Sequence, residues 1–225
     1  MSFSNFIKEL NGDRVEGELL KTSLFSLVSS FAIFFLLYFL FLRGADSGNK
    51  IFFIFMSILS YALILPAIRQ VQAYKMMPCM SGMMIGMTIG MVAGFLPSYY
   101  LAATNGMFYG AVWGMILGIF FGYQNGKCCG VMGVMEGVMA GFMGGLMGSM
   151  TSIMLLNDHL IPMSIIVFVI SAIIIFALNY MIYKEMRNEK RQHAENYVSI
   201  ILWSIILTAI TFFVILFGPR GGIFA

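Results

Sequence analysis

Long uncharged stretches alternate with short charged segments along the whole chain. Most of these stretches are close to the roughly 20 residues that an α-helix needs to cross a hydrocarbon core of about 30 Å. Lipid offers the backbone no hydrogen-bond partners, so each stretch is predicted to be a transmembrane helix. The pattern predicts seven helices, at residues 22–42, 51–68, 76–103, 107–123, 128–156, 162–183 and 197–217. The expected fold class is therefore all-α, a polytopic membrane protein with a single transmembrane domain over residues 22–217.

The longest uncharged stretch, residues 76–126, is too long for one span. Pro97-Ser98 and then Thr104-Asn105-Gly106 supply turn chemistry that splits it into two helices. Residues 1–21 place apolar side chains on one helical face, which predicts an amphipathic segment on the cytoplasmic surface. Residues 218–225 are expected to form a short external tail.

The distribution of basic residues predicts the orientation. With a cytoplasmic N-terminus, ten Lys and Arg residues fall in cytoplasmic segments and three, Arg43, Lys50 and Arg220, fall outside. This imbalance satisfies the positive-inside rule and needs an odd number of spans. The N-terminus is therefore expected inside and the C-terminus outside.

Composition narrows the possible functions. Of the 225 residues 60% are hydrophobic and only 10% are charged, which excludes an ordinary soluble domain. A net charge of +3 leaves no basic surface large enough for nucleic acid. We find no nucleophile elbow, zinc-protease motif or phosphate-binding loop, and we expect no enzymatic activity.

Glycine recurs at every fourth position in the middle of the chain. This spacing lines one helix face with bare backbone and lets another helix approach closely, the pattern of a glycine zipper. Similar series occur in the predicted helices on either side, so residues 76–156 are expected to form a tightly packed central core of three helices. The series in residues 107–123 and the residue before it is Gly106, Gly110, Gly114, Gly118 and Gly122.

Methionine repeats beside these glycines. Thioether sulfur is a soft, uncharged ligand that suits Cu(I), and helical spacing aligns such ligands in a ladder. The alternative is that methionine only fills gaps opposite the glycine surfaces. Leu, Ile and Phe fill space in the other predicted helices, so the change of residue type favours the metal hypothesis. The candidate ligands are Met83, Met87, Met91, Met135, Met139 and Met143.

Other candidate groups lie near these rows. Cys79 and Cys128 stand at the predicted cytoplasmic starts of two core helices and are candidate ligands for collecting or releasing the ion, or else small buried hydrophobes. Glu136 is the one ionisable residue well inside a predicted span, where it balances charge, relays a proton or accepts a hydrogen bond from a group such as Thr88. Asp158-His159 forms a polar cluster in an outer loop, more typical of a plain loop than of a ligand set.

The spacing of Met83 and Met87, followed by Gly106 and Gly110, resembles the signature of the eukaryotic copper-transporter family. In that family a Met-x3-Met helix lines a trimeric pore and a Gly-x3-Gly helix permits its close packing. This chain differs in having seven predicted spans instead of three, in lacking a Met-rich extracellular tail, and in repeating the methionine stripe near residue 139. Its Met/Gly-rich stretches are also similar to copper-handling membrane proteins of bacteria. The resemblance implies a soft-metal role for Met83, Met87 and Met91.

Two hypotheses of different class follow. The first is transport or handling of a soft metal ion, Cu(I), in the bacterial cytoplasmic membrane. The second is a non-catalytic accessory subunit that assembles, with copies of itself or with another membrane protein, through its glycine helices. A pore for another solute is a weaker third alternative. The expected partners are the lipid bilayer and a second membrane-protein chain, without nucleic acid.

Overall fold

The computed structural model describes residues 15–37, 48–72, 78–185 and 197–218, together with residues 39 and 74. All regular secondary structure in these ranges is helical, which confirms the all-α part of the predicted fold class. The elements are α2 (Val15–Leu37), α3 (Gly48–Gln72), α4 (Cys79–Asn105), α5 (Met107–Gly126), the short 3-10 helix η2 (Lys127–Cys129), α6 (Gly130–Met154), α7 (Leu160–Glu185) and α8 (Tyr197–Phe217).

Five helices among the described residues are long and apolar enough to cross a membrane, and this supports an integral membrane protein. Their spanning segments are Ile51–Gln72, Cys79–Asn105, Met107–Gly126, Gly130–Met154 and Leu160–Glu185. The apolar stretches described in α2 and α8, Ser23–Leu36 and Ile201–Leu216, are shorter than a span. The described residues therefore provide five of the seven predicted spans.

Several helices extend beyond the predicted apolar limits. Helix α2 begins at Val15, so residues 15–21 continue this helix instead of forming part of a separate amphipathic segment. Helix α3 runs through Pro66 to Gln72, four residues past the predicted end. Hydropathy marks where apolar side chains begin, whereas backbone hydrogen bonds carry a helix on into its polar flanks. Residues 1–14 of the predicted N-terminal segment and residues 219–225 of the predicted tail lie outside the described residues.

The turn between α4 and α5 occurs at one glycine. Pro97 is buried inside α4, which continues to Asn105, so the predicted turn chemistry at Pro97-Ser98 does not reverse the chain. Gly106 reverses it, with φ 103°, a conformation that residues with a side chain disfavour. Its N–H donates to the carbonyl of Ala102 at 3.1 Å, and its own carbonyl accepts from the N–H of Gly110 at 3.2 Å. This glycine closes one helix and opens the next.

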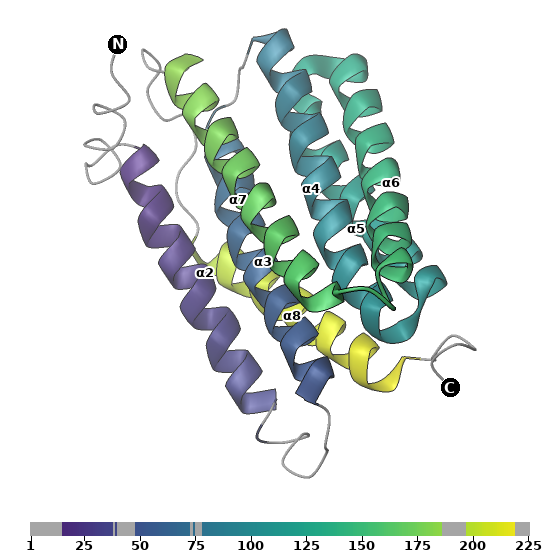
Figure 1. Cartoon of the computed structure of the whole chain (residues 1–225). Helices are drawn as coiled ribbons and strands as arrows, with labels where there is room; N and C mark the ends of the chain where they lie inside the picture. Colours follow the sequence, from purple (N-terminus) through teal and green to yellow (C-terminus); the bar gives the residue numbers. More distant parts are fainter. Residues whose placement is uncertain are drawn as a thin grey trace.

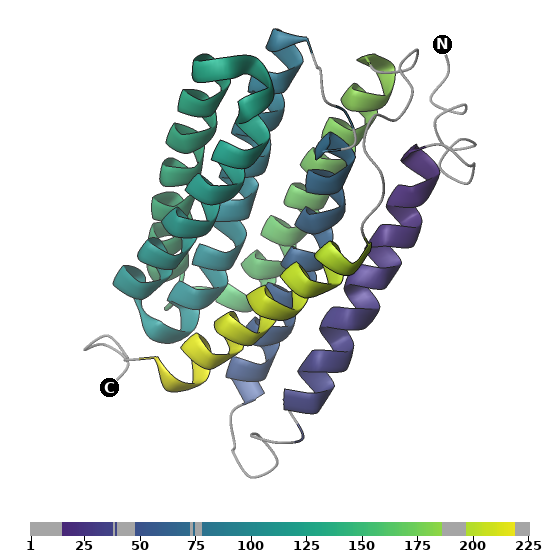
Figure 2. The ribbon, with the colours of Figure 1, turned by 180° about the vertical axis from the view of Figure 1, so that it is seen from behind.

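The glycine-rich helices form one side of the molecule. Helices α4, α5 and α6 lie together on the right of Figure 1, and the opposite view in Figure 2 shows the same grouping. Helices α2, α3 and α7 lie on the other side, and α8 crosses obliquely behind them. The triplet is therefore not the central core that we predicted. Hydropathy cannot separate the two arrangements because a helix that faces lipid is as apolar as one that faces protein.

The large buried side chains lie where the triplet meets the other helices. Tyr99 and Tyr100 of α4 are fully buried, with their rings edge-to-face and 5.5 Å apart. The Tyr100 hydroxyl donates to the carbonyl of Ser164 on α7 at 3.4 Å. Little more than one turn further along, at the last residue of α4, the side-chain amide of Asn105 donates to the carbonyl of Val214 on α8 at 2.6 Å. These contacts fix the triplet against α7 and α8.

Candidate functional site

Helices α5 and α6 meet backbone to backbone. A Cβ atom placed on Gly118 would lie 2.6 Å from the carbonyl oxygen of Gly141 and 2.8 Å from its Cα. One turn along, a Cβ on Gly122 would collide with the carbonyl of Gly137. Ordinary contacts of a Cβ atom begin at 3.4 Å, so neither position has room for a side chain. Helix α6 can approach α5 this closely only because both surfaces lack side chains.

Helix α4 joins the same interface. A Cβ on Gly90 would lie 2.7 Å from the carbonyl oxygen of Gly137 and 3.2 Å from the Cα of Gly122. The hydroxyl of Ser98 donates to the carbonyl of Gly145 at 2.6 Å, which adds a hydrogen bond between α4 and α6. Each of the three helices therefore contacts the other two through backbone that carries no side chain. We call this contact surface the glycine interface.

The predicted glycine series plays three different parts. Gly106 forms the turn between α4 and α5. A Cβ on Gly110 would lie 2.6 Å from the Cβ of Ala102 on α4, whereas one on Gly114 would meet both α4, at Gly94, and α6, at Gly145. Gly118 and Gly122 face α6. The four glycines of this series within α5 thus change partner along the helix because a straight helix rotates its every-fourth-residue row around its axis.

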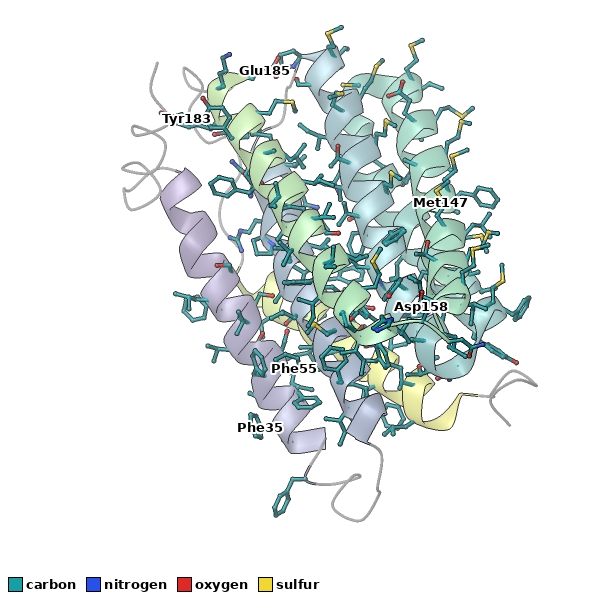
Figure 3. The ribbon with its side chains drawn as sticks, viewed as in Figure 1. Phe35, Phe55, Met147, Asp158, Tyr183 and Glu185 are labelled. Atoms are coloured by element: carbon teal, nitrogen blue, oxygen red, sulfur yellow. The ribbon has the colours of Figure 1, made fainter. Side chains whose placement is uncertain are left out.

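The methionine side chains of α4 and α6 point away from the glycine interface. Figure 3 shows sulfur atoms along both helices, with Met147 directed outward from α6. Among the described residues, none of the buried hydrophobic side chains that form the core is a methionine. We call these side chains the methionine rows. The exposed members are Met80, Met84, Met87 and Met91 on α4, and Met132, Met135, Met139, Met143, Met147, Met150 and Met154 on α6.

The row on α4 is shifted from the predicted one. Met87 and Met91 are exposed, whereas Met83 is only partly exposed. Met80 and Met84 take its place at the outer surface. At about 100° per residue Met80, Met84, Met87 and Met91 lie within a sector of about 60°, and Met83 lies about 40° outside it.

Helices α4 and α6, which carry the two rows, are in backbone contact at Met91, near the middle of α4. A Cβ on Gly144 of α6 would lie 2.5 Å from the carbonyl oxygen of Met91 and 3.1 Å from its Cα. Gly144 stands between Met143 and Met147 in the α6 row. The backbone of α4 therefore contacts α6 at a point where both helices carry exposed thioethers.

Glu136 lies on the outer face of α6, among the methionines, and is exposed. Thr88 does not supply the hydrogen bond that we considered for this carboxylate, because its hydroxyl donates to the carbonyl of Met84 in its own helix at 2.7 Å. A threonine in a helix commonly satisfies its hydroxyl in this way. Glu136 thus places a carboxylate beside the α6 thioethers and away from the glycine interface.

Cys79, one of the two predicted cysteine ligands, contacts Cys129. Cys79 is exposed at the start of α4, and the thiol of Cys129 donates to its backbone carbonyl at 3.1 Å. The side chain of Cys128, the predicted partner, lies outside the described residues. Across the described part of the chain, no three His, Cys, Asp or Glu side chains come together as a metal site.

The outer loop keeps its polar pair on the surface. His159 Nδ1 lies 2.6 Å from a carboxylate oxygen of Asp158, and both side chains are largely exposed. His159 has φ 41°, an uncommon conformation for a residue with a side chain. The loop lies at the end of α6 and places no third ligand beside this pair among the described residues.

A row of buried hydroxyl groups was missed by our sequence reasoning. Ser29 on α2 and Ser204 on α8 share a hydrogen bond of 2.9 Å. The ring N–H of Trp113 donates to the hydroxyl of Tyr61 on α3 at 3.4 Å. Serine recurs in these apolar helices, and that recurrence was the available signal. Such hydroxyls commonly join membrane helices.

Comparison of the chain with protein-family models, with curated proteins and with solved structures finds no match.

Proposed function

We propose that this protein binds and conducts a soft metal ion, Cu(I), along the methionine rows of α4 and α6. The observation that carries the proposal is that the chain keeps these methionines out of its core. If they were gap fillers, they would pack against the buried side chains, as the partly buried Met56, Met163 and Met181 do, yet the row methionines are exposed. A different use of the thioether groups is needed, and metal binding is the use that sulfur supports best.

The spacing of the α6 row suits a series of weak sites. Successive methionines from Met132 to Met154 are three or four residues apart, so each neighbouring pair lies on one face with Cβ atoms about 5–6 Å apart. Two or three thioethers from adjacent turns can then converge on one ion. Conduction needs binding that is favourable enough for entry and weak enough for exit, and uncharged thioethers meet this condition. Glu136 balances the charge of the passing cation.

The proposed setting is the bacterial cytoplasmic membrane. In this proposal α2 and α8 also cross the membrane, which brings the number of spans from five to seven. The N-terminus is then inside and the C-terminus outside, as the count of basic residues favours. The ion passes along the outer surface of α4 and α6, so a second copy of the chain or another membrane protein closes the path. No enzymatic step is part of this function.

A second candidate function is favoured by the position of α6. This helix packs mainly against α4 and α5, and its opposite face is open over its whole length. Glu136 on that face is costly to leave against lipid. An accessory subunit that docks another membrane protein through this face would also explain the exposed methionines, as adaptable contact residues.

Cu(I) titration separates the two functions. We would titrate the purified protein in detergent, without oxygen, against a chromogenic Cu(I) chelator. One variant replaces Met84, Met87 and Met91 by leucine, and a second makes the same change at Met139, Met143 and Met147. The control variant replaces Met56, Met107 and Met163, which lie outside the rows. Leucine conserves the volume of methionine, so all three variants should fold.

Cu(I) transport predicts that both row variants lose Cu(I) equivalents whereas the control binds as the wild type does. Equal stoichiometry in all four proteins would refute the methionine rows as the metal path. The accessory function would then be left, because it requires no metal.

A further inference from the structure

Two cysteines from separate segments lie together at the end of the bundle where the methionine rows begin. Cys79 is the first residue of α4, and Cys129 is the last residue of η2. The Sγ atom of Cys129 lies 3.1 Å from the carbonyl oxygen of Cys79 and 3.8 Å from that of Pro78. The thiol of one cysteine is therefore held on the backbone of the other, although 50 residues separate them in the chain.

Local glycines produce this arrangement. Gly130 follows η2 with φ 68° and turns the chain into α6, a conformation that is strained for any residue with a side chain. A Cβ on Gly133 would lie 2.9 Å from the Cβ of Cys129, so this cysteine packs over bare backbone. A Cβ placed on Gly86 of α4 would also lie 3.1 Å from the Cα of Gly126, the last residue of α5. The glycine interface thus continues to this end and fixes η2 against α4.

Methionines of both rows start beside the cysteine pair. Met80 follows Cys79 directly and is 83% exposed, and Met132 lies three residues after Cys129 and is 69% exposed. Cys79 itself is exposed and Cys129 is partly exposed, so both thiols can be reached from solution. Each methionine row therefore begins within three residues of one of the two cysteines.

We propose that Cys79 and Cys129 form a two-thiolate Cu(I) site that loads the methionine rows. This inference rests on the proposed function, for which it names the entry site. The Sγ of Cys129 leaves the carbonyl by rotation of its side chain, and each thiol loses one proton as it binds. The ion remains Cu(I) throughout, so two protons are released to solvent and no electron is transferred. Met80 then exchanges for one thiolate and passes the ion to the α4 row, and each thiolate takes a proton back from solvent as it is displaced.

The chemistry of this site differs from that of the rows. Thiolate is a stronger ligand than thioether and binds a proton in competition with the metal, whereas a thioether carries none. Cys79 stands at the first position of α4, where the helix dipole favours a negatively charged ligand. The site therefore captures the ion tightly and with release of protons, and the rows take it on without protons.

Single serine variants of the full chain test the assignment. Cys79→Ser and Cys129→Ser each remove one proposed ligand, and Cys128→Ser removes the competing ligand that the sequence alone predicts. Each protein is titrated with Cu(I) in detergent without oxygen, and both the chelator competition and the protons released are recorded. Circular dichroism checks that each variant is folded.

We expect Cys79→Ser and Cys129→Ser to lose the tightest equivalent of Cu(I), with a fall in affinity of more than about 100-fold, since losing a group that merely supports a ligand already costs 10–100-fold. Proton release should fall with it. Cys128→Ser should keep both the affinity and the two protons. A loss in Cys128→Ser with retention in Cys129→Ser would overturn the pairing, as would wild-type affinity in all three variants.

The same titration separates this inference from the proposed function. Leucine variants of the methionine rows should still bind the one tightly held Cu(I) ion that releases protons, and should lose the more weakly bound Cu(I) ions. A wild type that binds one ion with two protons and no further ions would refute the rows but leave the cysteine site. Wild-type protein that binds no Cu(I) would overturn both.

Discussion

Replacing Gly118 by alanine should force α5 and α6 apart. The added Cβ would lie 2.6 Å from the carbonyl oxygen of Gly141, and ordinary contacts begin at 3.4 Å, so the two backbones must separate by about 0.8 Å. The obstructing atoms belong to the backbone and cannot turn away as a side chain would. A radial gap of 0.5–1 Å costs each contact a quarter to a half of its dispersion energy.

The net effect can be set against the gain in helix propensity. Overpacking of this kind costs about 1–3 kcal/mol, and a rigid backbone neighbour places Gly118→Ala toward the upper end. Alanine gains about 0.5–1 kcal/mol over glycine inside a helix. We therefore expect Gly118→Ala to lower the free energy of unfolding by about 1–2 kcal/mol.

Unfolding in mixed micelles measures this difference. The fraction of sodium dodecyl sulfate is raised stepwise, and the fluorescence of the two tryptophans, Trp113 on α5 and Trp203 on α8, follows the loss of structure. Ile116→Ala is the control, because Ile116 is exposed on the same helix and its truncation should change stability by less than about 0.5 kcal/mol. If Gly118→Ala proves as stable as the wild type, or more stable, the backbone contact between Gly118 and Gly141 is refuted.

Two further substitutions test other parts of the fold in the same assay. Asn105→Ala removes the hydrogen bond to the carbonyl of Val214 and should lower the free energy of unfolding by about 1–2 kcal/mol. Backbone amides at the end of α8 should then exchange hydrogen faster. Unchanged exchange there would contradict the docking of α8 on α4. His159→Gly removes the strain of a side chain at positive φ, so the free energy of unfolding should stay unchanged or rise by up to about 1 kcal/mol. A clear loss of stability would show that the contact with Asp158 matters more than the strain.

The periodicity of the sequence predicted where the helices lie in the chain, but not which helices pack against one another. The fourfold spacing through Gly118 and Gly122 predicts a bare helix face, and in the structure this face meets glycine backbone. The same spacing cannot tell that Gly106 is a turn, since only the backbone dihedral angles distinguish a turn glycine from an interface glycine. It also cannot tell that the triplet lies on one side of the molecule, because in a membrane protein the exposed face is as apolar as the buried one.

That the candidate methionines bind a metal stays a prediction. Met87 and Met91 are exposed and Met83 is only partly exposed, a difference that helical spacing alone cannot give, because it fixes the angle of a residue but not the neighbouring helix. Cys129 is the cysteine whose thiol donates to the backbone of Cys79, and the side chain of Cys128, the predicted ligand, lies outside the described residues. No spacing rule chooses between two adjacent cysteines.

X-ray absorption at the copper edge tests the central claim most directly. The sample is the Cu(I)-loaded protein in which Cys79, Cys128 and Cys129 are all replaced by serine, so that methionine provides all the remaining sulfur. Copper held by the methionine rows predicts a shell of two or three sulfur neighbours around copper, and loss of this shell in the leucine variant of Met139, Met143 and Met147. A shell of nitrogen or oxygen, or a protein that retains no copper, would contradict it.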